Sequence, residues 1–321
     1  MNRPRVDQVK LRLGRPDISR YADRFAVPAA TSHSRLRVTF LGVATLLIDD
    51  GTSAIMTDGF FSRPSLLRVA TTALSPDRAR ITSALERAGV TRLGAVLPVH
   101  SHYDHAKDSA VVAALTDAVL IGGESTLNIG RGGDLAEDRL VLARSGGSLR
   151  IGPYEITHIA SEHCPPDRFP GVIDEPLRPP ASVKAYLCGE AWSITVEHAP
   201  SGQRMLIQGS AGFVPGALAQ QRADVVYLGV GQLGLRPEAE IRRYWAETVE
   251  LVGARRVVLI HWDDFFRPLT RPLRAAPFLG DDLDTTMRIF DELSAQSGIE
   301  VLLPTPWQPS DPWSWPSGPT A

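Results

Sequence analysis

The segment with the clearest chemical potential is a run of ligand-type side chains, His100-Ser101-His102-Tyr103-Asp104-His105. It follows an apolar run over 93–99 that is typical of a buried strand. Alternate residues of an extended chain point the same way, so His100 and His102 can aim at one point. Asp104 and His105 follow on a turn and can aim at a second, neighbouring point, as two-metal sites require. Neutral imidazoles with a carboxylate suit Zn²⁺ first, with Mn²⁺ or Fe as competitors.

The elements around this run indicate an α/β protein. Short alternating runs between 36 and 58, with a turn at Asp50-Gly51, predict an antiparallel meander. Helices are predicted from Ser75-Pro76 to Gly89 and over 106–115, 237–252 and 281–296. Further strands are predicted at 118–122, 139–143, 148–152, 154–160, 183–189, 192–198, 204–209, 224–230, 255–260 and 301–303. The two halves look alike in plan, and two mixed sheets that stack with helices outside would accommodate this order.

The chain of 321 residues fits one large domain with two appended segments. We expect an N-terminal arm over 1–35, a single domain over 36–303 and a Pro/Trp-rich tail over 304–321. Prolines exclude a helix or a central strand in the tail, and its tryptophans are expected to pack on the body. The Pro- and Gly-rich stretch 161–182 is long for a structureless loop, so it is either a functional lid or a mobile excursion.

Composition narrows the class of partner. The chain has 34 basic and 36 acidic residues, so no bulk field draws it to nucleic acid or to an anionic membrane. Two cysteines cannot form a disulfide framework and fit a reducing compartment. The first 25 residues hold no apolar signal-like segment, and no apolar run approaches the ~18 residues of a membrane span. We therefore expect a cytoplasmic protein with a small-molecule substrate, no nucleic-acid partner and no transmembrane segment.

The run at 100–105 resembles the His-x-His-x-Asp-His signature of the metallo-β-lactamase superfamily. The resemblance spans roughly residues 36–265 and implies a four-layer αββα sandwich. It also implies a later ligand at His163, which follows a strand-like run, and a last ligand at His261, at the tip of RRVVLIH. An early aspartate that supports the site from behind the ligands corresponds to Asp58. The local HYDH resembles the branch of ascorbate-6-phosphate lactonase-like and N-acyl-phosphatidylethanolamine phospholipase D-like proteins.

By the same resemblance, the ligands divide into two sets. His100, His102 and His163 would hold one metal, and Asp104, His105 and His261 the other. His158 is an alternative to His163, but it lies within a strand pattern and reads better as a core residue. The family usually has a metal-bridging aspartate where this chain has Ser210, in Gly-Ser-Ala-Gly. A hydroxyl is a poorer ligand than a carboxylate, so the second site should bind metal more weakly.

Charged residues after the last ligand are the candidates for orienting and recognition roles. Asp263 or Asp264 could orient a ligand imidazole by a hydrogen bond. Arg267, Arg271 and Arg274 follow in an acid-free loop and could clamp phosphate or carboxylate. Arg168 and Arg178 in the 161–182 loop are weaker candidates of the same kind. The substrate is therefore predicted to be anionic.

The predicted function is a metal-dependent hydrolase that acts on an ester, lactone or phosphodiester. Metal-activated hydroxide would attack, and Asp104 would orient or deprotonate the water. Two alternatives stay open. One is a mononuclear iron oxidoreductase on the same fold, which the missing bridging aspartate favours; the other is a non-catalytic metal-binding module, which has no need for six converging ligands.

Overall fold

Two mixed seven-stranded sheets form the body of the molecule. The computed structural model describes residues 12–315. The first sheet has the order β14-β1-β2-β3-β4-β5-β6; its strands are β1 (Arg37–Phe40), β2 (Leu46–Asp49), β3 (Ala54–Thr57), β4 (Ala95–Leu97), β5 (Val119–Gly122), β6 (Leu140–Leu142) and β14 (Pro309–Ser310). The second has the order β13-β12-β11-β10-β9-β8-β7; its strands are β7 (Ser148–Ile151), β8 (Tyr154–Ser161), β9 (Ala191–His198), β10 (Gln203–Gln208), β11 (Val225–Gly229), β12 (Arg256–Ile260) and β13 (Glu300–Leu302).

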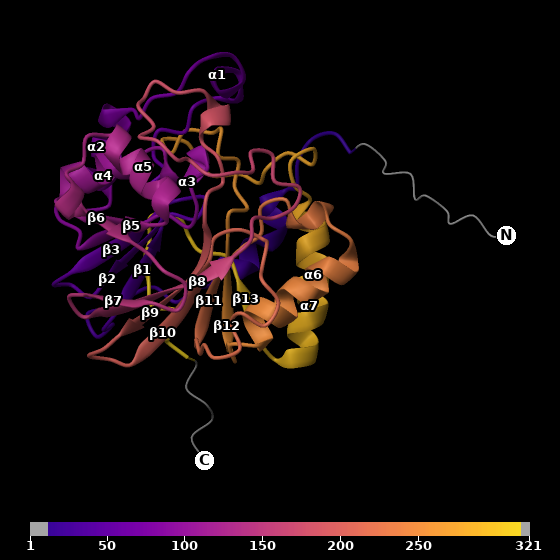
Figure 1. Ribbon diagram of the computed structural model, residues 1–321. Helices are drawn as coiled ribbons and strands as arrows, with labels where there is room; N and C mark the ends of the chain where they lie inside the picture. The colour runs from indigo at the N-terminus through magenta and orange to yellow at the C-terminus, as the bar shows by residue number, and fades with distance from the viewer. Residues whose placement is uncertain (1–11, 316–321) are drawn as a thin grey trace.

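Helices cover the outer faces of the two sheets (Figure 1). The α-helices are α1 (Leu66–Thr71), α2 (Arg78–Arg87), α3 (Tyr103–Ala106), α4 (Ser109–Thr116), α5 (Glu124–Gly132), α6 (Glu238–Trp245) and α7 (Leu283–Ser297). Short 3₁₀ turns are η1 (Ile18–Arg24), η2 (Glu137–Arg139), η3 (Val183–Ala185) and η4 (Leu233–Leu235), and a π-helical turn, η5 (Ala246–Glu250), extends α6. Helices α2, α4 and α5 lie beside the first sheet, and α6 and α7 lie beside the second (Figure 1). No described helix is both long and apolar enough to cross a bilayer.

The two sheets face each other across one shared core. Phe40 and Ile55 of the first sheet belong to the same cluster of buried side chains as Ile194 and Leu206 of the second. A core of this size supplies the main driving force for stacking the sheets. The predicted fold, two mixed sheets with helices outside, is confirmed.

Strand direction brings several loop-forming strand ends to one edge. In the first sheet, β3, β4, β5 and β6 run parallel; in the second, β10, β11, β12 and β13 do. Strand β8 is antiparallel to β9, which is antiparallel to β10, so β8 also runs in that common direction. The segments after β3, β4, β8, β10 and β12 therefore leave from common edges, where ligands bind in open α/β sheets.

The arm and the tail pack against the body and against each other. Val27 is buried in the shared core, and Ala29 forms a β-bridge with Ser310 of β14. Strand β14 pairs with β1 at the edge of the first sheet, a position that tolerates proline. The described parts of the arm and the tail thus pack on the body, and the boundaries at 35 and 303 stay a prediction. Residues 1–11 and 316–321 of those segments lie outside the described residues.

The structure differs from the prediction in three places: one predicted strand is absent, one helix begins later than predicted, and one helix was not predicted. The predicted strand at 183–189 is instead the turn η3 followed by irregular chain, because Cys188 and Gly189 donate their backbone N–H groups to Phe169 and Gly171 of the preceding loop. The helix predicted from Ser75 is α2, which is capped by the Asp77 side chain. Helix α1 lies in a segment for which no element was predicted.

Candidate metal centre

Six predicted ligands converge at the common edge of the two sheets. They form two groups in which one ligand atom of each residue lies within 4.8 Å of the others: His100, His102 and His163, and Asp104, His105 and His261. His100 and His102 follow β4, Asp104 and His105 lie on α3, and the last two histidines follow β8 and β12. The structure therefore brings together all six residues, in the two sets that the resemblance implies.

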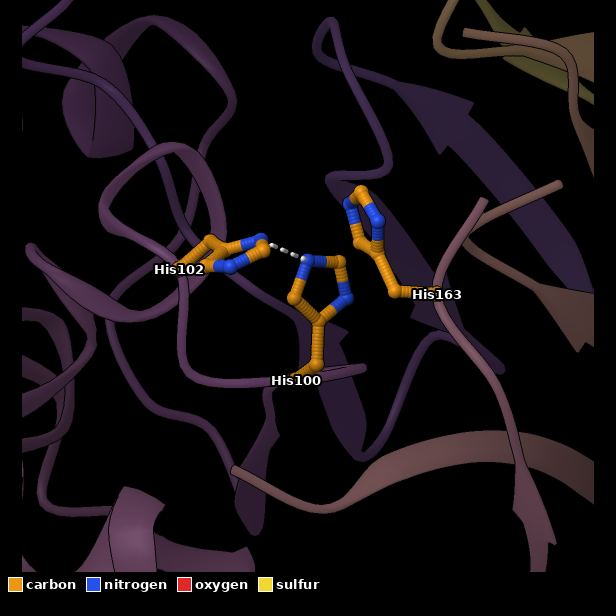
Figure 2. A group of neighbouring side chains, drawn as sticks. All are labelled: His100, His102 and His163. Carbon is orange, nitrogen blue, oxygen red and sulfur yellow. Dashed lines mark hydrogen bonds between the residues drawn. The ribbon is translucent and has the colours of Figure 1, made fainter. Parts of the chain in front are cut away.

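The first group is a pocket of three imidazoles. Figure 2 shows the rings of His100, His102 and His163 gathered from two chain segments. The centroids of the His102 and His163 rings lie 4.7 Å apart, and those of His100 and His163 lie 5.0 Å apart. His100 Nε2 and His102 Nδ1 lie 3.1 Å apart. Nitrogen atoms facing one another at this range provide the donor set that Zn²⁺ and similar cations prefer.

The second group lies directly beside the first. The His100 and His105 ring centroids lie 4.0 Å apart, and those of His105 and His261 lie 5.1 Å apart. Asp104 Oδ2 lies 3.6 Å from His261 Nε2 and 3.8 Å from His105 Nε2. One carboxylate and two imidazoles make a mixed donor set suited to a second divalent cation.

Asp58 orients His105. Its Oδ2 accepts a hydrogen bond from His105 Nδ1 at 2.7 Å, while its Oδ1 accepts the backbone N–H of Val99 at 3.0 Å. The His105 Nε2 atom is buried and has no hydrogen-bond partner among the described residues. A carboxylate on one ring nitrogen leaves the lone pair of the other free, which is the usual arrangement around a ligating histidine. This orphaned nitrogen fits a bound metal ion.

Two rings of the first group, those of His163 and His102, are oriented by atoms of the 161–182 loop. His163 Nδ1 donates to the carbonyl of Cys164 at 2.7 Å, which leaves Nε2 unprotonated. His102 Nε2 lies 3.2 Å from Asp167 Oδ1 and 3.3 Å from the Phe169 carbonyl. Both partners of His102 belong to the 161–182 loop, so this loop takes part in the site. No local motif identifies Asp167, because its contact with His102 depends on the tertiary position of the loop.

Burial keeps the first group neutral. Burial lowers the pKa of His100 well below its ordinary value, and the neighbouring imidazoles lower it further. Burial likewise lowers the pKa of His163 to about 4 and, despite nearby carboxylates, lowers that of His102. Neutral imidazole is the form that binds metal, so the three rings are ready to ligate at neutral pH.

The second group has the opposite balance. Burial would raise the pKa of Asp104, but His105 and His261 lower it below its ordinary value. Burial would lower the pKa of His105, but Asp58 and Asp104 raise it. Asp104 is therefore an anion in this setting, available either as a ligand or as a hydrogen-bond acceptor for water.

His261 has a left-handed backbone conformation that neighbouring residues hold in place. Its φ is +58°, in a region that residues other than glycine adopt uncommonly. Its backbone N–H donates to the carbonyl of Val43 at 2.7 Å, and the N–H of Val43 donates to Asp263 Oδ1 at 2.8 Å. Asp263 thus supports His261 through Val43 rather than by a bond to an imidazole.

Of the two remaining candidates, His158 lies outside the ligand groups and Ser210 lies beside His163. His158 is buried in β8 against Trp192, outside both ligand groups, as expected for a core residue. Ser210 lies at the site: its Oγ accepts the backbone N–H of Cys164 at 2.9 Å, next to His163. Neither ligand group contains a carboxylate that both share.

The three predicted anion-binding arginines have other neighbours. Arg274 pairs with Asp264 at 2.8 Å, and Arg267 Nε donates to the Pro272 carbonyl at 2.7 Å. Arg271 lines a cavity of about 500 Å³ together with Trp262 and Trp307. These contacts place the guanidinium groups within their own loop and at that cavity.

Comparison with solved structures shows a shared fold at low sequence identity. A protein named as a metal-dependent hydrolase from Parabacteroides distasonis has a TM-score of 0.53 and 14% identity, with 87% of this chain and 98% of that chain covered. Igni18, a metallo hydrolase from Ignicoccus hospitalis, has a TM-score of 0.50 and 13% identity over 85% and 97%. CmlA, a diiron β-hydroxylase from Streptomyces venezuelae, has a TM-score of 0.51 and 11% identity over 87% and 54%.

These likenesses define the class of fold. The chain has the metallo-β-lactamase-type sandwich, and the resemblance inferred from residues 100–105 is confirmed at that level. No family profile and no curated protein matches the sequence. Because proteins named as hydrolases and one named as a hydroxylase share this architecture, the fold by itself does not fix the reaction.

Proposed function

We propose that this protein is a metal-dependent hydrolase whose six converging ligands bind one or two ions, Zn²⁺ in the first instance and Mn²⁺ or Fe as alternatives. The observation that carries the proposal is the pair of adjacent ligand groups, one of three neutral imidazoles and one of Asp104, His105 and His261. Its fold neighbours include proteins named as metal-dependent hydrolases, which supports the same reading.

The roles of the chain's own residues follow from their chemistry. A divalent cation held here would supply Lewis-acid polarisation and would lower the pKa of a water molecule from 15.7 to near 7. The neutral imidazoles of the first group would hold it, and Asp58 would keep His105 in the tautomer that presents Nε2. Asp104, an anion beside both groups, would accept a proton from the attacking water or orient it.

The substrate in this proposal is a small anionic ester, lactone or phosphodiester. Kinship with the lactonase-like or phospholipase D-like branch remains part of the proposal, and it rests on the local His102-Tyr103-Asp104-His105 sequence. A panel of one carboxylic ester, one lactone and one phosphodiester, each with a chromogenic leaving group, would define the reaction class.

The test uses protein reconstituted separately with Zn²⁺, Mn²⁺ and Fe²⁺. Hydrolysis should appear with at least one metal, vanish on chelation and fall at least about 10³-fold in His102→Ala. His33→Ala is the matched control, because His33 is exposed and lies outside both ligand groups. Equal turnover by His102→Ala and the parent protein would refute the proposal.

A second candidate, a mononuclear iron oxidoreductase, is favoured by one observation, the serine at position 210. Without a shared bridging carboxylate, the three-histidine group can bind a single ion on its own. This function predicts oxygen uptake by the iron-loaded protein and no hydrolysis. A non-catalytic metal-binding module predicts neither, even with metal bound.

A further inference from the structure

A second cavity, of about 420 Å³, opens beside α1 and the N-terminal end of α2. Four arginines line it: Arg63, Arg68, Arg78 and Arg80. Its other walls include the polar Ser62 and the apolar Phe266. A concave site with several guanidinium groups is suited to a planar or tetrahedral oxyanion.

The cavity carries a net positive charge. Asp77 is the one acidic residue in its lining, and it pairs with Arg80 at 3.2 Å. Arg80 is braced further, since its Nη1 donates to the carbonyl of Ser62 at 2.7 Å. The side chains of Arg68 and Arg78 make no hydrogen bond or ion pair with any residue in 12–315, so both charges are available to a ligand.

Arg63 adds a buried cation to this wall. Its side chain is fully buried, and Nη1 donates to Asp263 Oδ2 at 2.7 Å. The Nε and Nη2 atoms have no acceptor among the described residues, an arrangement that costs free energy unless a negative group is near. Gly42 makes room for this guanidinium, because a Cβ at that position would lie 1.9 Å from Nη2.

The cavity shares a wall with the metal centre. Asp263, the partner of Arg63, also accepts the N–H of Val43, whose carbonyl holds His261. Phe266 of the cavity packs on Phe265 at 4.5 Å between ring centroids, and Phe265 packs on His261 at 5.8 Å. Two packed rings, those of Phe266 and Phe265, therefore lie between the cavity and a ligand imidazole.

We propose that this cavity binds the oxyanion of the substrate, a phosphate or a carboxylate, while the scissile bond of the same substrate is held at the metal centre. The inference rests on the proposed hydrolase function and relocates anion recognition. The recognising groups are Arg68 and Arg78, with Arg63 behind them, in place of the arginines at 267, 271 and 274.

The direct test measures anion binding without turnover. Isothermal titration of the metal-loaded protein with inorganic phosphate, and separately with acetate, should show binding of at least one. The double variant Arg68→Ala/Arg78→Ala should bind it at least about tenfold more weakly. The control Arg35→Ala/Arg144→Ala removes the same charge from exposed positions outside the cavity lining and should bind like the parent protein.

Preference for phosphate or for acetate identifies the oxyanion, and either preference supports the site. The inference is overturned if neither anion binds, if the double variant binds as tightly as the parent, or if Arg267→Ala/Arg271→Ala/Arg274→Ala is the variant that loses binding.

A kinetic arm connects the cavity to the substrate. In Arg68→Ala/Arg78→Ala, KM for an anionic ester should rise about tenfold, while kcat/KM for a neutral ester stays unchanged. An equal effect on both esters would mean a structural defect and would overturn the inference. Failure of the hydrolase proposal would appear differently, as absence of turnover in the parent protein with anion binding intact.

Discussion

The hydrogen bond from His105 Nδ1 to Asp58 determines which ring nitrogen of this histidine carries the proton. In Asp58→Asn, the amide oxygen can still accept from Val99, which places the amide NH₂ group toward His105. The imidazole would then carry its proton on Nε2, the atom that faces the ligand group. We expect metal affinity at the second group to fall about 10–100-fold.

A chelator-competition titration measures this effect, with Asp138→Asn as the control, because Asp138 is exposed and belongs to neither ligand group. Unchanged affinity in Asp58→Asn would show that His105 is not a ligand.

Ser210 permits a second prediction at this scale. Its hydroxyl accepts the N–H of Cys164, and an aspartate could keep that bond with one oxygen while offering the other to a metal. Ser210→Asp should therefore raise the stoichiometry under limiting metal toward two ions per chain, as two-metal sites require. Two equally tight sites in the parent protein, measured by titration calorimetry, would contradict the prediction that Ser210 weakens metal binding at the second site.

Single residues were predictable where a local motif specified them. His100, His102, Asp104 and His105 lie within six positions, and Asp58, His163 and His261 follow from the resemblance. Asp167 and Arg63 were not predictable, because their roles depend on contacts between distant segments. Arg63 and its partner Asp263 are 200 positions apart, and only the stacked sheets bring them together.

At the scale of elements, the C-terminal strand β14 is an integral part of the first sheet. Ser310 pairs with β1, and Trp313 is buried and donates its indole N–H to the carbonyl of Arg204. The buried Arg256 donates to the carbonyl of Pro312 at 2.5 Å. A chain that ends at Leu303 should lose at least about 3 kcal/mol of unfolding free energy. It loses the packed Trp313 and removes a hydrogen-bond acceptor of the buried Arg256.

Urea denaturation compares this truncation with a chain that ends at Trp315, which keeps all the contacts just described. If both chains unfold at the same urea concentration, β14 contributes no stability and the assignment of the tail to the sheet core is wrong.

Regular elements were predictable from periodicity, and irregular ones were not. The strands with alternating or continuous apolar runs, such as β1 to β5 and β8 to β13, lie close to their predicted ranges. The run at 183–189 has a similar composition but donates its backbone N–H groups to the 161–182 loop instead of a strand. Composition alone does not distinguish these cases, since the partner of each N–H group is set by tertiary structure.

At the scale of the whole molecule, one buried acid couples stability to pH. Burial raises the pKa of Asp281 to about 8, against the backbone hydrogen bonds from Gly234 and Asp282, which lower it. The unfolded chain releases this proton near pH 4. The neutral Asp281 carboxyl therefore contributes fully to the free energy of unfolding below about pH 4. This contribution is lost progressively as the pH rises to about 8, by at most about 1.4 kcal/mol per pH unit.

Asp281→Asn removes the titration and keeps an oxygen for the N–H of Gly234. Its unfolding free energy should exceed that of the parent at pH 8 and approach it at pH 5, as measured by urea denaturation. A parallel pH dependence in both proteins would exclude Asp281 as the source.

The central claim is that the six converging side chains hold metal, and elemental analysis tests it most directly. Protein purified after reconstitution with Zn²⁺, Mn²⁺ or Fe²⁺ should contain about one to two ions per chain of at least one metal. His100→Ala/His102→Ala should lose the ion of the first group, about one ion per chain, while keeping the far-ultraviolet circular dichroism of the parent. A parent protein that binds none of these metals, or a folded double variant that binds as much as the parent, would contradict the claim.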